Sequence, residues 1–295
     1  MQPSSQGSAP GPKPIAIETS IAARARGSDA WLVDIWGVMH NGVQPFGDAV
    51  AACEAFRAAG GTVLLLSNAP RPATSVAAQL DKIGVRRSAW DAIISSGDAT
   101  RRLLQDQPKS PLFHLGPDRD LPIYEGLDLE LADEHSARQV VCTGLFDDET
   151  ETPDDYLPLL TRFLTQSCPM ICANPDLTVE RRGKLVYCAG AIAAKYEAMG
   201  GHVTYAGKPH LPIYDMALAW IAQQRGGEIA IERVLAIGDG VRTDILGAAR
   251  AGIASVYIAS GVNMPAGSTL DAATLAAMFD DPAIQPVAAM DALRW

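Results

Sequence analysis

The sequence has few cysteines, and their spacing excludes two common roles. Five cysteines occur among 295 residues, which is an odd number, and no two of them form a C-x-x-C pair. A structural zinc site or a framework of disulfides is therefore not expected. Most of the cysteines have apolar neighbours, so we expect buried, reduced thiols in a cytoplasmic protein. They are Cys53, Cys142, Cys168, Cys172 and Cys188.

Long apolar runs are also absent. No run approaches the roughly 20 consecutive apolar residues that a membrane-spanning helix needs, so no membrane partner is expected. The first residues, "MQPSSQGSAPGPKP", lack the apolar segment of a secretory signal. Because they are rich in proline, glycine and serine, residues 1–13 are predicted to form a disordered lead-in.

The chain has no excess of basic residues. Its formal net charge is −10, which argues against non-specific binding of nucleic acid. A small anionic substrate is not excluded, because a bound metal ion can reverse the local field. With 48% hydrophobic and 20% charged residues, the composition is that of an ordinary globular protein with one large domain or two smaller ones.

Short apolar runs alternate with amphipathic helical segments along most of the chain. This pattern predicts an α/β fold with a doubly wound, Rossmann-like parallel sheet, whose ligands bind beyond the carboxyl ends of the strands. The predicted strands are "AWLVD", "TVLLLS", "DAIISSG", "RVLAIGD" and "ASVYIA".

The middle of the chain has strands and helices of its own. We therefore expect an inserted α/β domain over residues 97–205, with the core formed by residues 14–96 and 206–295. The acidic stretch "FDDETETPDD" lies in this insert. Thr152, Pro153 and Asp155 fit the first positions of a helix, where carboxylates are favourable, so a capping role is preferred to a second metal site.

Polar residues follow three of the predicted core strands. Asp34 ends the first strand, Ser67 and Asn68 end the second, and "GDGVRTD" follows a later one. Lys208, in "AGKPH", precedes the helix that leads to that later strand. Because the carboxyl ends of parallel strands share one edge of a sheet, these side chains are expected to converge.

The residue types in this set indicate phosphoryl transfer. Asp34, Asp239 and Asp244 would repel one another without a hard cation such as Mg²⁺, which also neutralises phosphate oxygens. Ser67 offers a hydroxyl group and Lys208 a positive charge to the phosphate. Asp34 can then attack phosphorus and form an aspartyl-phosphate. The P-loop pattern of nucleotide-binding proteins is absent.

The ordered motifs resemble a known family. "DIWGVMHNG", "LLLSNAP", "YAGKPH" and "GDGVRTDILGAARAGI" resemble the four motifs of the haloacid dehalogenase superfamily. The middle segment, with "GLFDDETETPDDY", "ICANPDL" and "GAIAAKYEAMGG", resembles the cap domain of its class IIA branch. That branch includes NagD-like sugar phosphatases and the pyridoxal-phosphate and phosphoglycolate phosphatases. The resemblance implies a Mg²⁺-dependent hydrolase of small phosphate monoesters, and dimers through the cap are common in the branch.

The resemblance also implies a metal site. Asp34 corresponds to the nucleophile and to a magnesium ligand. Residue 36, here Trp36, corresponds to a position that binds the metal through its backbone carbonyl. Asp239 matches the main metal carboxylate, and Asp244 matches a second acidic position that supports the metal or its waters.

Substrate-binding residues follow from the same resemblance. Ser67 and Lys208 match the pair that holds the phosphate, and Asn68 matches the residue that orients nucleophile and substrate. Asn174 and Asp176 belong to an Asn-Pro-Asp motif of the cap, which faces the active site when the cap closes.

Trp36 departs from the family pattern. Most phosphatases of the superfamily have a second aspartate here, which protonates the leaving alcohol, and an indole cannot exchange a proton in this pH range. General acid–base catalysis typically contributes about 10²–10⁴ in rate. The protein could be a slow phosphatase that relies on a good leaving group or on bulk water. Alternatively, His40 takes over the role, although a structural loop histidine is the preferred interpretation, or the chain is a non-hydrolytic binder of a phosphorylated metabolite.

Overall fold

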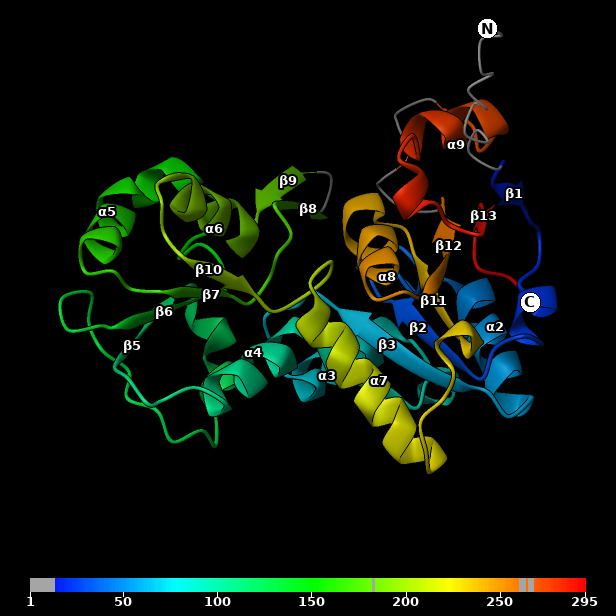
Figure 1. The fold of residues 1–295 in the computed structure, drawn as a ribbon, viewed down its shortest axis with the longest axis horizontal. Coiled ribbons are helices and arrows are strands. Elements are labelled where there is room, and N and C mark those ends of the chain that lie inside the picture. The colour runs from blue at the N-terminus through cyan, green and yellow to red at the C-terminus, as the bar shows by residue number, and fades with distance from the viewer. Residues whose placement is uncertain (1–13, 182–183, 260–263, 265–267) are drawn as a thin grey trace, which may run out of the picture.

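Two parallel β-sheets organise the chain (Figure 1). The computed structural model describes residues 14–181, 184–259, 264 and 268–295, so the predicted lead-in over residues 1–13 lies outside the described residues. The larger sheet has the order β1-β13-β12-β11-β2-β3-β4, and all its pairings are parallel. Its strands are β1 (Ala16–Ile17), β2 (Ala30–Asp34), β3 (Thr62–Ser67), β4 (Ala92–Ser95), β11 (Val234–Gly238), β12 (Ala254–Ile258) and β13 (Ala288–Met290).

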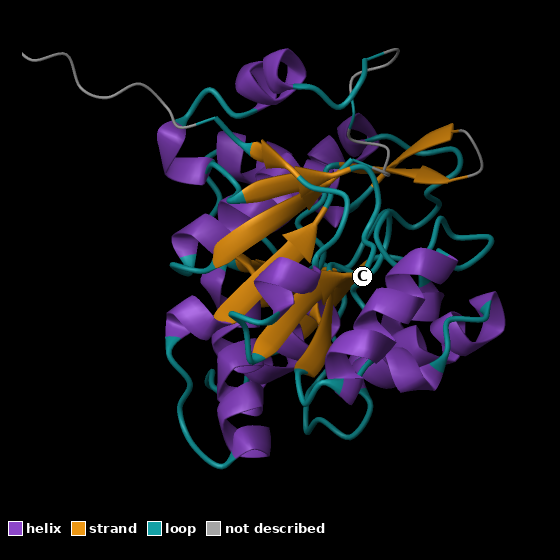
Figure 2. Cartoon of the chain, turned by 90° about the vertical axis from the view of Figure 1, so that its right-hand side faces the viewer, coloured by secondary structure: helices purple, strands orange, loops and turns teal. Residues whose placement is uncertain are grey.

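Helices cover both faces of this sheet, and Figure 2 shows them on either side of the strands. Alternate residues of β2 enter different apolar clusters. Trp31 and Val33 pack with α2 and α3, whereas Leu32 packs with α7 and α8. The Trp31 indole stacks on Phe56 with 3.9 Å between ring centroids. Burial on both faces confirms the predicted doubly wound α/β sheet. The helices are α1 (Ala22–Ala25), α2 (Gly47–Ala58), α3 (Ala73–Ile83), α4 (Ser96–Gln105), α7 (Leu211–Arg225), α8 (Leu246–Arg250) and α9 (Ala272–Met278).

The strand order reverses at β2, and this reversal positions the site. The chain steps from β2 to β3 and β4 on one side, and it returns through β11 on the other side of β2. In open α/β sheets, ligands bind at such a switch point, beyond the carboxyl ends of the strands. Asp34 is the last residue of β2, and Asp239 follows β11 directly.

The smaller sheet is formed by the middle of the chain. It is parallel throughout, with the order β10-β7-β6-β5, and an antiparallel pair, β8 and β9, follows β7. α4 contacts both parts, since Ala99 joins an apolar cluster of the larger sheet and Leu104 one of the smaller sheet. The elements are β5 (Leu112–Leu115), β6 (Gln139–Cys142), β7 (Met170–Cys172), β8 (Thr178–Arg181), β9 (Lys184–Tyr187), β10 (Val203–Tyr205), α5 (Leu157–Thr165) and α6 (Ala189–Ala198).

The acidic stretch of the middle segment begins a helix, as predicted. Thr152 and Asp155 form a reciprocal capping box around the 3₁₀ turn Pro153–Tyr156, which continues into α5. The Asp155 carboxylate accepts hydrogen bonds from the backbone N–H and the hydroxyl of Thr152, at 2.8 and 2.9 Å. No helix in the described part of the chain combines the length and apolar character needed to cross a bilayer.

Candidate active site

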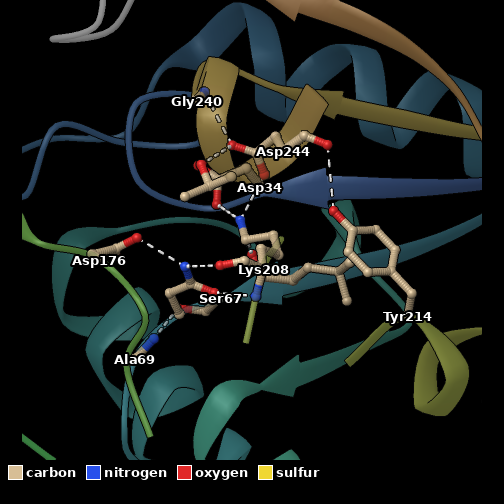
Figure 3. A network of polar contacts seen from close by, with 11 residues as sticks. Asp34, Ser67, Ala69, Asp176, Lys208, Tyr214, Gly240 and Asp244 are labelled. Carbon is tan, nitrogen blue, oxygen red and sulfur yellow. Dashed lines mark hydrogen bonds and ion pairs between the residues drawn. The ribbon is translucent and has the colours of Figure 1, made fainter. Parts of the chain in front are cut away.

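The side chain of Lys208 bridges two aspartates that are far apart in the sequence. Its side chain is 3% exposed, and its Nζ donates to the Asp34 carboxylate and, at 2.7 Å, to Oδ1 of Asp244. Figure 3 shows these three side chains pointing toward one another. The predicted convergence of Asp34, Lys208 and Asp244 is therefore present in the geometry.

Asp239 completes an acidic cluster. Asp34, Asp239 and Asp244 are all buried, and each offers a carboxylate oxygen within 4.8 Å of the others. Asp244 lies in the π-helical turn Val241–Ile245, where the Gly240 N–H donates to its Oδ2 at 3.1 Å. The Tyr214 hydroxyl of α7 donates to the backbone carbonyl of Asp244 at 3.3 Å. Tyr214 was not predicted from the sequence, because it is one of several apolar and aromatic residues along its helix.

Gly37 lies directly against the cluster. It has φ +88°, and a Cβ added there would lie 2.2 Å from Oδ2 of Asp239. Only glycine combines that backbone conformation with such a close approach. The loop after β2 is therefore shaped around the Asp239 carboxylate, a role for Gly37 that is not predictable from the residue pattern alone.

The charge balance of the cluster favours a bound cation. The ammonium group of Lys208 pairs with two of the three clustered carboxylates, those of Asp34 and Asp244. Burial and the neighbouring Asp244 raise the pKa of Asp34 to about 7, although Lys208 opposes the shift. Burial lowers the pKa of Lys208, but the attraction of Asp244 and Asp34 outweighs it and holds that pKa above its ordinary value. Buried carboxylate oxygens of this number and spacing fit a hard divalent ion.

Ser67 and Asn68 lie next to Lys208, at the end of β3. The half-buried Ser67 accepts a hydrogen bond from the Ala69 N–H at 3.1 Å. Asn68 is buried, its Oδ1 accepts from the Lys208 N–H at 2.8 Å, and its Nδ2 donates to the Lys208 carbonyl at 3.0 Å. Asn68 thus fixes the backbone that carries Lys208.

The loop after β7 reaches the same place from the smaller sheet. Oδ1 of Asp176 accepts a hydrogen bond from Nδ2 of Asn68 at 2.8 Å. Asn174 is used within the loop, where its Oδ1 accepts from the Asp176 N–H at 3.1 Å. The structure therefore brings Asp176 to Asn68, which is bonded to the backbone of Lys208, whereas the Asn174 side chain stabilises the turn that carries Asp176.

Trp36 and His40 lie in the loop that follows β2. Trp36 is half-buried, and its indole Nε1 is 3.5 Å from the position that a Cβ would take on Gly42. His40 is 2% exposed, and its Nδ1 accepts a hydrogen bond from the Gly42 N–H at 2.8 Å. Burial lowers the pKa of His40 to about 4. These contacts favour a structural role for His40.

Comparisons with known proteins agree with this geometry. A family model described as haloacid dehalogenase-like hydrolase matches residues 31–130, and a second, HAD-hydrolase-like model matches residues 205–283. A haloacid dehalogenase-like hydrolase of known structure from Brucella suis is 44% identical, with a TM-score of 0.84 over 94% of this chain and 99% of that chain.

Two mycobacterial comparisons point to phosphatases. D-glycerol 3-phosphate phosphatase of Mycobacterium tuberculosis is 28% identical over 81% of this chain, and the chain spans 65% of the length of that relative. The structure of a glycerol phosphate phosphatase from the same organism, in complex with calcium, is 25% identical, with a TM-score of 0.67 over 90% of this chain and 73% of that chain. The similar proteins confirm the predicted fold class and support the prediction of a phosphatase. The chain belongs to the haloacid dehalogenase-like hydrolase family.

Proposed function

We propose that the protein is a Mg²⁺-dependent phosphatase of small phosphate monoesters, which acts through an aspartyl-phosphate on Asp34. The observation that carries this proposal is the buried cluster of Asp34, Asp239 and Asp244 with Lys208, at the switch point of the larger sheet. The mycobacterial relative acts on glycerol phosphate, which supports an alkyl or sugar phosphate as the substrate class.

The metal would be held by the carboxylates of Asp34, Asp239 and Asp244 and by the backbone carbonyl of Trp36. When bound, a divalent cation neutralises phosphate oxygens and makes phosphorus more electrophilic. The donor set consists of oxygen atoms, as Mg²⁺ prefers, and the close approach of Gly37 to Asp239 keeps that carboxylate in place.

In the first step, a carboxylate oxygen of Asp34 attacks phosphorus, and the bond between phosphorus and the leaving oxygen breaks. Lys208 orients Asp34 and contributes positive charge, and Asn68 holds the backbone that carries Lys208, while Ser67 offers its hydroxyl group to another phosphate oxygen. In the second step, water attacks phosphorus and releases inorganic phosphate, which regenerates Asp34.

A panel of phosphate monoesters tests this function. Release of inorganic phosphate should require Mg²⁺ and should fall to background in Asp34→Asn. Turnover that is unchanged in that variant, or absent for every ester, would remove the proposal.

A second candidate is a non-hydrolytic or very slow binder of a phosphorylated metabolite. Trp36 favours it, because the usual proton donor of the family is missing at this position. Thermal stabilisation by a phosphate monoester in the presence of Mg²⁺, without product, would support this alternative.

Location and assembly are part of the same proposal. All five cysteines are free and buried, which is consistent with a cytoplasmic protein. A homodimer through the predicted cap stays a prediction, as do the domain limits of 14–96 and 206–295 for the core and 97–205 for the cap.

A further inference from the structure

We propose that Asp176 replaces the missing proton donor: its carboxyl group protonates the leaving oxygen and then accepts a proton from the attacking water. This inference rests on the proposed phosphatase function. The loop after β2 lacks a proton donor, because the indole of Trp36 cannot exchange a proton near neutral pH. The proposal assigns that role to the loop after β7.

A short series of contacts ties Asp176 to the nucleophile. Asp176 accepts a hydrogen bond from Asn68 at 2.8 Å, and Asn68 is bonded to both the N–H and the carbonyl of Lys208. The ammonium group of Lys208 in turn donates to Asp34. Figure 3 shows the Asp176 carboxyl group pointing inward, toward the side where Ser67 and Lys208 lie. Asp176 therefore borders the space where the phosphate is proposed to bind.

The in-line geometry of phosphoryl transfer favours a proton donor in the loop after β7. In phosphoryl transfer, the attacking and leaving oxygens lie roughly in line on opposite sides of phosphorus. Asp34 attacks from the end of β2 in the larger sheet, so the leaving oxygen faces away from that sheet. Asp176 approaches from the carboxyl end of β7 in the smaller sheet. It thus lies on the side of the leaving group.

Close packing holds the loop in place. A Cβ on Gly190, in the first turn of α6, would lie 2.2 Å from the Pro175 carbonyl oxygen and 2.5 Å from that of Asp176. On the other side, a Cβ on Gly207 would lie 2.5 Å from Oδ1 of Asn68 and 2.9 Å from Pro175. A group fixed in this way can act without first being ordered, which favours catalysis.

The surroundings favour the protonated form of Asp176. Burial raises the pKa of its carboxyl group, and the negative charge of Asp244 acts in the same direction. The hydrogen bond from Asn68 and the charge of Lys208 act in the opposite direction but do not cancel the rise. The thiols of Cys172 and Cys188 are also near, and burial raises the pKa of both, so they stay neutral.

The proton balance closes over one turnover. As an Asp34 oxygen bonds to phosphorus and the ester bond breaks, the Asp176 carboxyl group gives its proton to the leaving oxygen and an alcohol departs. The resulting Asp176 carboxylate then takes a proton from the water that attacks the aspartyl-phosphate. Inorganic phosphate leaves, Asp34 is a carboxylate again, and Asp176 is protonated again.

Asp176→Asn separates this role from a purely positioning one. Asparagine has almost the same shape, and its Oδ1 can still accept the hydrogen bond from Asn68, but it cannot donate an acidic proton. The readout is kcat/KM for p-nitrophenyl phosphate and for glycerol 3-phosphate. This constant covers only the steps up to the departure of the leaving group. Nitrophenolate leaves without a proton, whereas an alkoxide needs one.

The proposal predicts a loss that depends on the leaving group. In Asp176→Asn, kcat/KM for glycerol 3-phosphate should fall by about 10²–10⁴, while that for p-nitrophenyl phosphate should change only a few-fold. The wild-type kcat/KM for the alkyl ester should fall on the alkaline side as the donor ionises, and this limb should be missing in the variant. Asp176→Glu should recover part of the activity on the alkyl ester.

Asp120→Asn is the matched control. Asp120 is another carboxyl group from the middle of the chain. It is buried, and it pairs with the charge of Arg71 at 3.9 Å. Any effect of this variant should be the same for both substrates. Equal losses on both substrates in Asp176→Asn, or no loss on either, would overturn the role as proton donor. A wild-type protein that hydrolyses neither ester, or an Asp34→Asn variant that is as active as the wild type, would instead remove the underlying function.

Discussion

Gly37 shows how one residue without a side chain can shape the proposed metal site. Its left-handed backbone and its contact with the Asp239 carboxylate leave no room for a methyl group. Gly42 lies in the same loop with nearly the same φ, +85°, but the nearest atom to an added Cβ is 3.5 Å away, on Trp36. The two glycines therefore share a backbone conformation that would strain any other residue, but they differ in what they contact.

We predict that Gly37→Ala weakens Mg²⁺ binding and Gly42→Ala does not. Both variants should lose roughly 1–2 kcal/mol of unfolding free energy, because alanine is strained in this conformation. Only Gly37→Ala displaces Asp239, and its Mg²⁺ affinity should fall about 10–100-fold. Titration calorimetry with Mg²⁺ measures the difference. Equal affinities in the two variants would contradict the role assigned to Gly37.

Asp120 gives a prediction about pH. It is buried in the 3₁₀ segment Asp118–Tyr124, and burial raises its pKa to about 6, although Arg119, Arg71 and the Thr143 hydroxyl oppose the shift. The charge of Asp148 adds to the rise. Because the folded-state pKa lies above the unfolded one, the folded protein binds the extra proton between about pH 4 and 6. Asp120 therefore costs stability as pH rises through that window.

Asp120→Asn should remove this cost. Relative to the wild type, the variant should gain up to about 2–3 kcal/mol of unfolding free energy between pH 4 and pH 7. Urea unfolding of both proteins across this range is the measurement. A difference that stays constant with pH would show that Asp120 titrates normally in the folded state.

At the scale of elements, the parts of the site that depend on the local residue pattern could be predicted from the sequence. Asp34, Ser67 and Asp239 could be placed together because each lies at the carboxyl end of a strand or directly after it, and parallel strands end at one edge of a sheet. The contact of Asp176 with Asn68 was not predictable in detail, since it depends on how the smaller sheet lies against the larger one. The π-helical turn that carries Asp244 also has no signature in the residue pattern.

The capping box before α5 provides a test at this scale. Thr152→Ala removes one half of the reciprocal pair with Asp155, so the unfolding free energy should fall by about 1 kcal/mol. Phosphatase activity should stay at the wild-type level, because the acidic stretch is assigned a structural role. A loss of activity without a loss of stability would instead favour a second metal site there. Urea unfolding and phosphate release on the same samples distinguish the two outcomes.

At the scale of the whole molecule, two parallel sheets bring their functional loops together. The larger sheet contributes the acidic cluster. The smaller sheet contributes Lys208, which follows β10, and Asp176, which lies in the loop after β7. Neither sheet alone contains a complete set of groups for the proposed reaction. In the proposed reaction, this division supplies a chain that has tryptophan at position 36 with both a nucleophile, Asp34, and a proton donor, Asp176.

The central claim is that Asp34 becomes phosphorylated during turnover. Rapid acid quench of the protein mixed with p-nitrophenyl phosphate and Mg²⁺, followed by mass spectrometry of its peptides, tests this claim most directly. We predict one added phosphoryl group on the peptide that contains Asp34, absent in Asp34→Asn and absent when Mg²⁺ is removed with a chelator. Turnover with no such adduct at any quench time, or an adduct on a different residue, would contradict the account.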